Sequence, residues 1–166
     1  MNYLALNLLL AIVWMFLYGD FSTGNLVVGF LVGLIGIAFS RPVIGSRRYV
    51  RSVLGVVHLT AEFIRELVIA NVHLARDILS PVPPFQPGFV RFDIRDLGPT
   101  QTVLLTNLVS LTPGTLTVDV DDQGDTLYVH TLYAQDPASV RHGIRRFANL
   151  IHSATGSDPL PPEENA

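Results

Sequence analysis

Charged side chains are almost absent from the first quarter of this chain. It has 11 Arg and 14 Asp or Glu, and of these only Asp20 lies within residues 1–40. The whole chain is 49% hydrophobic and 15% charged, whereas soluble domains carry about 25% charged residues. Since a 40-residue segment with one charge has no polar face to turn towards water, the sequence predicts a membrane segment followed by one small domain.

Two apolar runs make up this segment. Residues 3–18 and 26–39 flank the sequence 19–25, which has the Gly, Asp, Asn and hydroxyl residues of a turn. We therefore expect a transmembrane helical hairpin over residues 1–40, although each run falls slightly short of the roughly 20 residues of a typical span. A signal peptide is one alternative, but no basic residue precedes the first run and a second follows. A buried hairpin of a soluble protein is the other.

The residues around the second apolar run predict its direction and its packing. Four arginines and no acidic residue occupy positions 41–51, and such basic flanks are typical of the cytoplasmic side. We expect the N-terminus and everything after residue 40 in the cytoplasm, on the strength of Arg41, Arg47, Arg48 and Arg51. Small residues let helices approach closely in lipid, and Gly29, Gly33 and Gly36 predict that this helix packs on another.

Residues 52–79 have helical periodicity, and their charged residues fall on one stripe of about 120°. Two interpretations are open. In the first, which we favour because the segment is rich in polar residues, the helix lies on the cytoplasmic membrane surface with its apolar face down. In the second, it crosses the membrane and the stripe faces an ion path. The candidate ion-path or interface residues are His58, Glu62, Arg65, Glu66 and His73. Two histidines without a third ligand make a poor metal site, so no metal is expected.

A proline-rich linker, residues 80–87, precedes the second domain. Alternating and helical patterns then predict a strand at 89–95, a helix at 99–111, a hairpin at 115–132 and a last helix from Asp136 to about Gly156. The order β-α-β-β-α predicts a small ferredoxin-like domain over residues 88–155, so the fold class is an α+β membrane protein. The acidic, proline-rich tail 156–166 is expected to be disordered.

Few residues of this domain form a pattern that is typical of a catalytic or binding site. The acidic hairpin turn (Asp119, Asp121, Asp122 and Asp125) invites a calcium interpretation, but it lacks the glycine and the closing glutamate of an EF-hand loop. There is no nucleophile motif and no phosphate-binding loop, so we expect neither a cofactor nor enzymatic activity. Arg141, Arg145 and Arg146 predict a basic patch. Ten acidic residues in the same part of the chain argue against binding of nucleic acid to this patch. Acidic lipid or an acidic subunit remains as its expected partner.

Several segments together resemble the E subunit of the Mrp-type (Mnh) multisubunit sodium/proton antiporter. They are Asn7-Leu-Leu-Leu-Ala-Ile-Val-Trp14, Leu26-Val-Val-Gly-Phe-Leu-Val-Gly33, Leu111-Thr-Pro-Gly-Thr-Leu-Thr-Val-Asp-Val120 and Leu127-Tyr-Val-His130. The resemblance implies a subunit of a bacterial plasma-membrane complex that exchanges sodium ions for protons, with the lipid bilayer and the other subunits as partners. It carries over no ion-binding residue. The family-motif turn, Thr112, Pro113, Gly114 and Thr115, has its own structural explanation, since Pro ends a helix, Gly permits a positive φ, and Thr hydroxyls cap backbone groups.

The leading hypothesis is an accessory and assembly subunit whose hairpin packs beside other subunits while its cytoplasmic domain braces the complex. The alternative is a membrane-tethered, ferredoxin-like module that senses a ligand or an ion, through the acidic hairpin turn for example.

Overall fold

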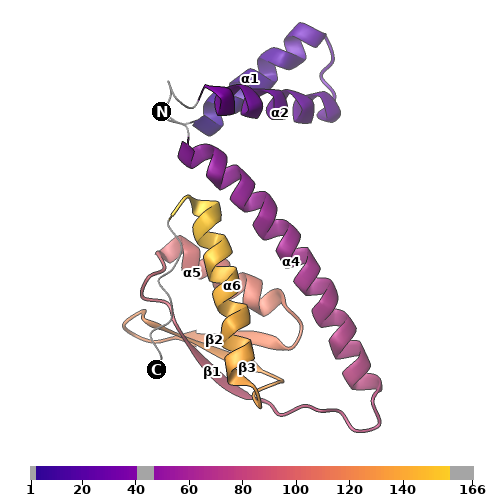
Figure 1. Cartoon of the computed structure of the whole chain (residues 1–166), viewed down its shortest axis with the longest axis vertical. Coiled ribbons are helices and arrows are strands. Elements are labelled where there is room, and N and C mark those ends of the chain that lie inside the picture. Colours follow the sequence, from indigo (N-terminus) through magenta and orange to yellow (C-terminus); the bar gives the residue numbers. More distant parts are fainter. Residues whose placement is uncertain (1–2, 41–46, 158–166) are drawn as a thin grey trace. The chain divides into compact units, whose positions relative to one another are not determined.

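A computed structural model describes residues 3–40 and 47–157 of the chain (Figure 1). The chain divides into two compact units, Met1–Leu54 and Gly55–Ala166, which are described separately. The first unit holds a helical hairpin. The second holds an antiparallel sheet with its helices. The predicted α+β class is confirmed.

The hairpin consists of α1 (Tyr3–Tyr18) and α2 (Thr23–Phe39). Gly19 adopts a positive φ of 69° at the turn, which a glycine does without strain. Ser22 then caps α2, because its Oγ accepts the Asn25 N–H at 3.3 Å. Asn25 in turn accepts the indole N–H of Trp14 at 3.0 Å, so one polar cluster closes the hairpin at its turn.

The two helices are 16 and 17 residues long, or about 24 to 26 Å at 1.5 Å per residue. Over residues 3–40 and 47–157, no helix reaches both the length and the apolar character that a membrane crossing demands. The predicted helices are present: α1 covers the first predicted run, and α2 begins at Thr23, three residues before the second. Both fall short of the roughly 20 residues of a typical span, as the sequence predicts.

The second unit begins within α4 (Arg47–Leu79) and continues through β1 (Gly88–Asp93), α5 (Pro99–Leu111), β2 (Thr115–Val120), β3 (Thr126–Thr131) and α6 (Pro137–Thr155). The strand order is β1-β3-β2, and both pairings are antiparallel. In this split β-α-β arrangement β1 and β2 run parallel, with β3 between them. The predicted order of strands and helices over residues 88–155 is thus present.

The core lies between one face of the sheet and the helices α5 and α6. Strand residues such as Phe92, Leu127 and Val129 alternate with exposed or half-buried residues and turn inward, where they meet Leu105 of α5 and Ile151 of α6. The last helix has the predicted ends. Asp136 accepts the Ser139 N–H at 3.0 Å, and Gly156 terminates the helix at φ 73°.

Two contacts join segments that the sequence divides into separate parts. The helix at 52–79 packs on residues 88–155, because Leu59 and Phe63 of α4 contact the core. The segment predicted as a linker is also bonded to the sheet end, since Gln86 exchanges backbone hydrogen bonds of 2.9 Å with Leu132 and Ala134. Figure 1 shows α4 passing close to the C-terminal end of α6 and diverging from it towards Leu79. Residues 41–46 and 158–166, which include Arg41 and most of the predicted tail, lie outside the described residues.

Candidate functional site

The contact between α4 and α6 is the main feature that brings the candidate residues together. It begins at Gly55, where an added Cβ would lie 2.7 Å from backbone atoms of Ser153 and Ala154. One turn beyond Leu59, the ring of Phe63 lies 6.3 Å from that of Phe147, centroid to centroid. The close backbone approach explains why a glycine occupies position 55.

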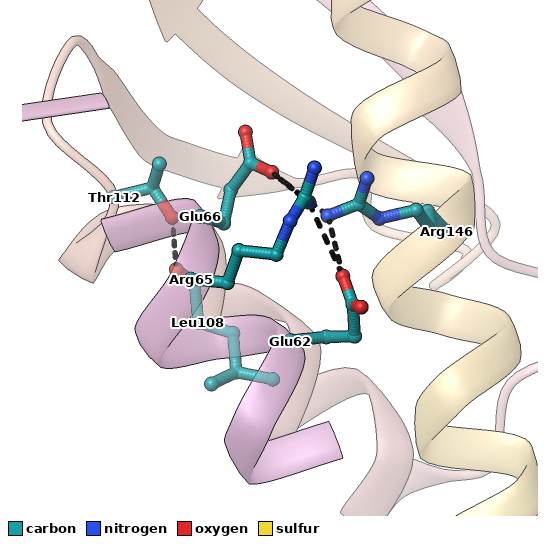
Figure 2. A network of polar contacts seen from close by, with 6 residues as sticks. All are labelled: Glu62, Arg65, Glu66, Leu108, Thr112 and Arg146. Atoms are coloured by element: carbon teal, nitrogen blue, oxygen red, sulfur yellow. Dashed lines mark hydrogen bonds and ion pairs between the residues drawn. The ribbon is translucent and has the colours of Figure 1, made fainter. Parts of the chain in front are cut away.

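A cluster of four charged residues, which we call the clamp, joins the two helices further along α4 (Figure 2). Arg146 of α6 donates from Nη2 to Glu62 Oε2 at 3.1 Å and to Glu66 Oε2 at 2.8 Å. Arg65 lies beside the same carboxylates, at 3.4 Å from Glu62 and 3.9 Å from Glu66. Figure 2 shows the Arg146 side chain reaching from α6 towards both glutamates. These two carboxylates of the predicted stripe therefore face α6.

Beyond the clamp, α4 is tied to the end of the sheet. The Tyr133 hydroxyl donates to Asp77 Oδ2 at 2.6 Å. Between these elements lies an open groove of about 670 Å³, whose lining includes Glu66, His73, Asp77, Thr112, Pro113 and Tyr133. Residues from the predicted stripe and from the family-motif turn, which the sequence suggested separately, thus line one groove.

The family-motif turn has the geometry expected from its residue types. Gly114 has a φ of 92°, which favours glycine. The hydroxyl of Thr112 donates to the Leu108 carbonyl at 2.9 Å, and that of Thr115 donates to the Val109 carbonyl at 2.8 Å. Both hydroxyls therefore cap carbonyls at the end of α5. A side chain at position 114 would also crowd Tyr133, since an added Cβ lies 3.2 Å from Tyr133 Cε2.

We predict that Arg146→Gln weakens the attachment of α4 to α6. The arginine side chain is 39% exposed, so we expect a loss of about 1 to 2 kcal/mol, between the values for exposed and buried ion pairs. Thermal unfolding of the full chain in detergent, followed by circular dichroism, measures this loss. Adding Glu62→Gln and Glu66→Gln to the variant should restore part of it, because no uncompensated carboxylate remains. Arg141→Gln, on the same helix but without an ion pair in the described chain, is the control, and an equal loss there would contradict the assignment.

A second prediction concerns alkaline pH. Burial and the hydrogen bond to Asp77 raise the pKa of Tyr133 from 10.0 to about 12. The folded chain then keeps a proton that the unfolded chain has lost, so this contribution to stability is present below pH 10.0 and is lost as the pH rises towards about 12. The free energy of unfolding should fall between about pH 9 and about pH 11 by more in the wild type than in Tyr133→Phe. Tyr128→Phe should keep the wild-type drop, and equal drops in all three chains would refute the prediction.

The glycines of the first unit form a second contact region. An added Cβ at Gly29 would lie 2.9 Å from Ala11 O and from Trp14 Cβ, and one at Gly33 would collide with Asn7 Oδ1. Gly36 does not belong to this contact, because it is exposed and its Cβ would meet nothing within 4 Å. The four-residue spacing continues instead to the buried Ile37.

Asn7 is the polar residue at the centre of the hairpin. It is fully buried, and its Nδ2 donates to the Tyr49 hydroxyl at 2.9 Å within the same unit. Among the described residues its Oδ1 has no hydrogen-bond donor, and it faces Gly33, where an added Cβ would collide with it. The amide thus joins α1, α2 and the start of α4.

The other candidate residues are dispersed. His58 and His73 are both exposed on α4 and lie 15 positions apart, and the structure does not bring them together. Arg47, Arg48 and Arg51 fall in the first turns of α4. The predicted basic patch is divided, since Arg146 belongs to the clamp whereas Arg141 lines a separate groove with Arg91 and Arg95.

The carboxylates of the acidic hairpin turn accept hydrogen bonds from backbone N–H groups of the hairpin itself. Asp121 Oδ1 accepts the N–H groups of Asp125 and Thr126 at 2.7 and 2.9 Å, and Asp119 accepts the N–H of Val120 at 2.8 Å. Within the described residues, no group of three or more acidic or histidine side chains is arranged to hold a metal ion. These contacts explain the acidic residues as turn-forming, and they give the ion-sensing alternative no support.

Comparison with known proteins decides the family. A family model described as "Na+/H+ ion antiporter subunit" matches residues 7–152. The chain is 31% identical to the E subunit of the Na(+)/H(+) antiporter of Bacillus subtilis, over 84% of this chain and 89% of that protein. It is 33% identical to the E1 subunit of the Na(+)/H(+) antiporter of Staphylococcus aureus, over 78% of this chain and 81% of that protein. The chain belongs to the family of Na+/H+ antiporter E subunits. The resemblance seen in the sequence is thereby confirmed.

Two solved structures are also similar to this member of the E-subunit family. One is the Mrp complex from a Dietzia species, with 28% identity, a TM-score of 0.44 and coverage of 57% of this chain and 89% of that chain. The other is the archaeal membrane-bound sulfane sulfur reductase, with 30% identity, a TM-score of 0.47 and coverage of 77% and 81%. The family match at residues 7–152 includes the hairpin from Asn7 onward, the clamp and the Thr112–Thr115 turn.

Three features of this antiporter subunit were not predicted from its sequence. Arg146 was assigned to a basic patch, and its glutamate partners lie 80 and 84 positions away in the chain. The other two are the close approach of α6 to Gly55 and the hydrogen bond between Tyr133 and Asp77. One signal was available for Gly55, since a glycine inside a regular helix, on the same side as Glu62 and Glu66, indicates a close neighbour.

Proposed function

We propose that this chain is an accessory subunit of a multisubunit Na+/H+ antiporter in the bacterial plasma membrane, where it supports assembly of the complex and does not form the main ion path. The proposal rests first on membership of the E-subunit family. As a transporter subunit it needs no active site of its own, and its partners are the other subunits.

The single structural observation that carries the proposal is the outer surface of the hairpin. Asn7 and Ala11 of α1 and Gly29 and Gly33 of α2 point inward, so the large apolar side chains point outward. Leu17 is 81% exposed and Phe39 is 84% exposed. Contiguous apolar patches of this extent are rare on soluble monomers and mark membrane or protein contacts. We assign this surface to lipid and to neighbouring subunits, with short helices that a locally thinned bilayer accommodates.

The second unit acts as a brace in this proposal. Glu62 and Glu66 are engaged by Arg146, so we assign them to holding α4 on the domain and not to ion movement. We retain the membrane-surface interpretation of the helix at 52–79 but with another face towards the lipid, because Phe63, on the apolar side opposite the charged stripe, packs on Phe147 of the domain. The domain and the membrane-facing helix then move as one body. In this proposal the cytoplasmic orientation follows from Arg41, Arg47, Arg48 and Arg51.

Deletion of the gene tests the proposal. Membranes from the deletion strain should show no assembled antiporter on a native gel, and everted vesicles should lose sodium-dependent proton exchange. A plasmid copy of the wild-type chain should restore both. If the remaining subunits assembled and exchanged ions normally without this chain, the assembly role would be refuted.

A further inference from the structure

The outward face of α4 is an uninterrupted apolar stripe. At 100° per residue, seven residues between positions 57 and 79 fall within a sector of about 80° on the side away from α6. All seven are apolar and exposed: Val57, Ala61, Ile64, Val68, Val72, Ala75 and Leu79. Val57 is 62% exposed and Leu79 is 83% exposed. The stripe is about 33 Å long. An ordinary surface helix exposes single, scattered apolar residues, whereas these seven form one continuous patch.

The arginines and the acidic residues of α4 between positions 57 and 79 are sorted by sign around this stripe. The acidic residues Glu62, Glu66 and Asp77 lie towards the domain, where Arg146 and Tyr133 bind them. His73 lies on the domain side, between Glu62 and Glu66, whereas the other basic residues between positions 57 and 79 lie along one border of the stripe, within about 40° of its edge, and these are His58, Arg65 and Arg76. Each of the three is exposed. The opposite border carries no charge.

We propose that this face of α4 docks on an anionic lipid surface, with the apolar stripe in the acyl boundary and the basic border on lipid phosphates. This inference rests on the proposed function, since it takes the hairpin to hold the chain at a bilayer. It deepens that function by naming anionic phospholipid headgroups as the partner of this face.

Charge complementarity favours an anionic bilayer over the other occupants. A basic border beside an apolar stripe matches the interfacial helices that bind negatively charged leaflets. Arg65 is only loosely held, at 3.4 and 3.9 Å from carboxylates already bound by Arg146, so it is available to a phosphate at little cost. A helix of a neighbouring subunit would cover the stripe equally well, but it would pair with the basic border only if it carried acidic side chains beside its own apolar face.

The experiment uses spin labels on the full chain, which contains no cysteine. Val68→Cys places a label on the stripe, Leu9→Cys on the outer surface of the hairpin, and Leu116→Cys on the exposed face of the sheet. Each labelled chain is reconstituted into phosphatidylcholine vesicles with or without phosphatidylglycerol. Accessibility to oxygen, which concentrates in lipid, and to a water-soluble nickel chelate then locates each label.

We expect the label at position 68 to enter lipid only when phosphatidylglycerol is present. Raising the ionic strength from about 0.1 M to about 1 M should release it, because the screening length falls from about 10 Å to about 3 Å. Arg65→Gln and Arg76→Gln should each weaken docking about fivefold, and together about 25-fold, in a phosphatidylglycerol titration. Arg141→Gln, which removes an arginine elsewhere in the same unit, should leave the titration unchanged.

Each other outcome has a definite meaning. A label at position 68 that stays accessible to nickel in both vesicle types, while position 9 is in lipid, overturns the inference and leaves the proposed function intact. Equal lipid exposure with and without phosphatidylglycerol also overturns it, because the basic border then has no role. Protection from both reagents indicates a protein partner and overturns it as well. If position 9 itself is not in lipid, the proposed function has failed.

Discussion

Replacing Gly55 by alanine is expected to separate α4 from α6. The added Cβ would lie 2.7 Å from backbone atoms of Ser153 and Ala154, and a backbone cannot swing aside as a flexible side chain can. We expect a loss of about 1 to 3 kcal/mol, the usual cost of overpacking, even though alanine is the better helix former. Thermal unfolding of the full chain in detergent measures this loss.

Gly143→Ala is the matched control for this prediction. Gly143 also lies inside a helix, but a Cβ added there meets nothing within 4 Å. The same substitution should therefore stabilise the chain by about 0.5 to 1 kcal/mol, because only the helix propensity changes. If the same Gly→Ala change lowers the stability at position 55 and raises it at position 143, the α4–α6 contact is the cause of the loss at position 55. A stabilising Gly55→Ala would mean that α4 does not dock on α6.

Replacing Gly29 by alanine is expected to have a similar effect on the hairpin. Its Cβ would lie 2.9 Å from the Ala11 carbonyl oxygen and from Trp14 Cβ, so α1 and α2 would be forced apart at a cost of about 1 to 3 kcal/mol. Trp14 is the one tryptophan in the chain, and its fluorescence therefore reports on the hairpin. Both the unfolding midpoint and the Trp14 emission should shift.

Gly36→Ala provides the comparison within the same helix. Gly36 lies outside the α1–α2 contact, so the substitution should leave the Trp14 emission unchanged. If Gly29→Ala and Gly36→Ala behaved alike, the inward position of Gly29 and the outward position of the apolar side chains would both be wrong. The assignment of the hairpin surface to lipid and to other subunits would then lose its structural support.

Much of the secondary structure of the second unit could be predicted, because the ends of its helices and its turns depend on residues that are close together in the sequence. Pro99 begins α5, and Asp136 with Pro137 begins α6, as the residue types indicate. Gly124 supplies the positive φ of the hairpin turn within the acidic sequence. These signals act over a few residues, so a single sequence contains them in full.

What the charged stripe of α4 faces could not be predicted in the same way. Periodicity placed Glu62, Arg65 and Glu66 on one stripe, but it could not tell whether the stripe faces water, an ion path or another part of the chain. The partner, Arg146, lies 84 positions beyond Glu62, and only the fold brings the two together. The same limit applies to Gly36, whose spacing resembles that of Gly29 and Gly33 although it points away from α1.

The central claim is that this chain is a subunit of a larger antiporter complex, and affinity purification of the tagged chain from its native membrane tests it most directly. The account predicts that the other antiporter subunits co-purify with it in fixed proportion, and that the amount recovered falls with the Gly29→Ala variant but not with Gly36→Ala. Recovery of the chain alone, from membranes in which the other subunits are present and assembled, would contradict the account.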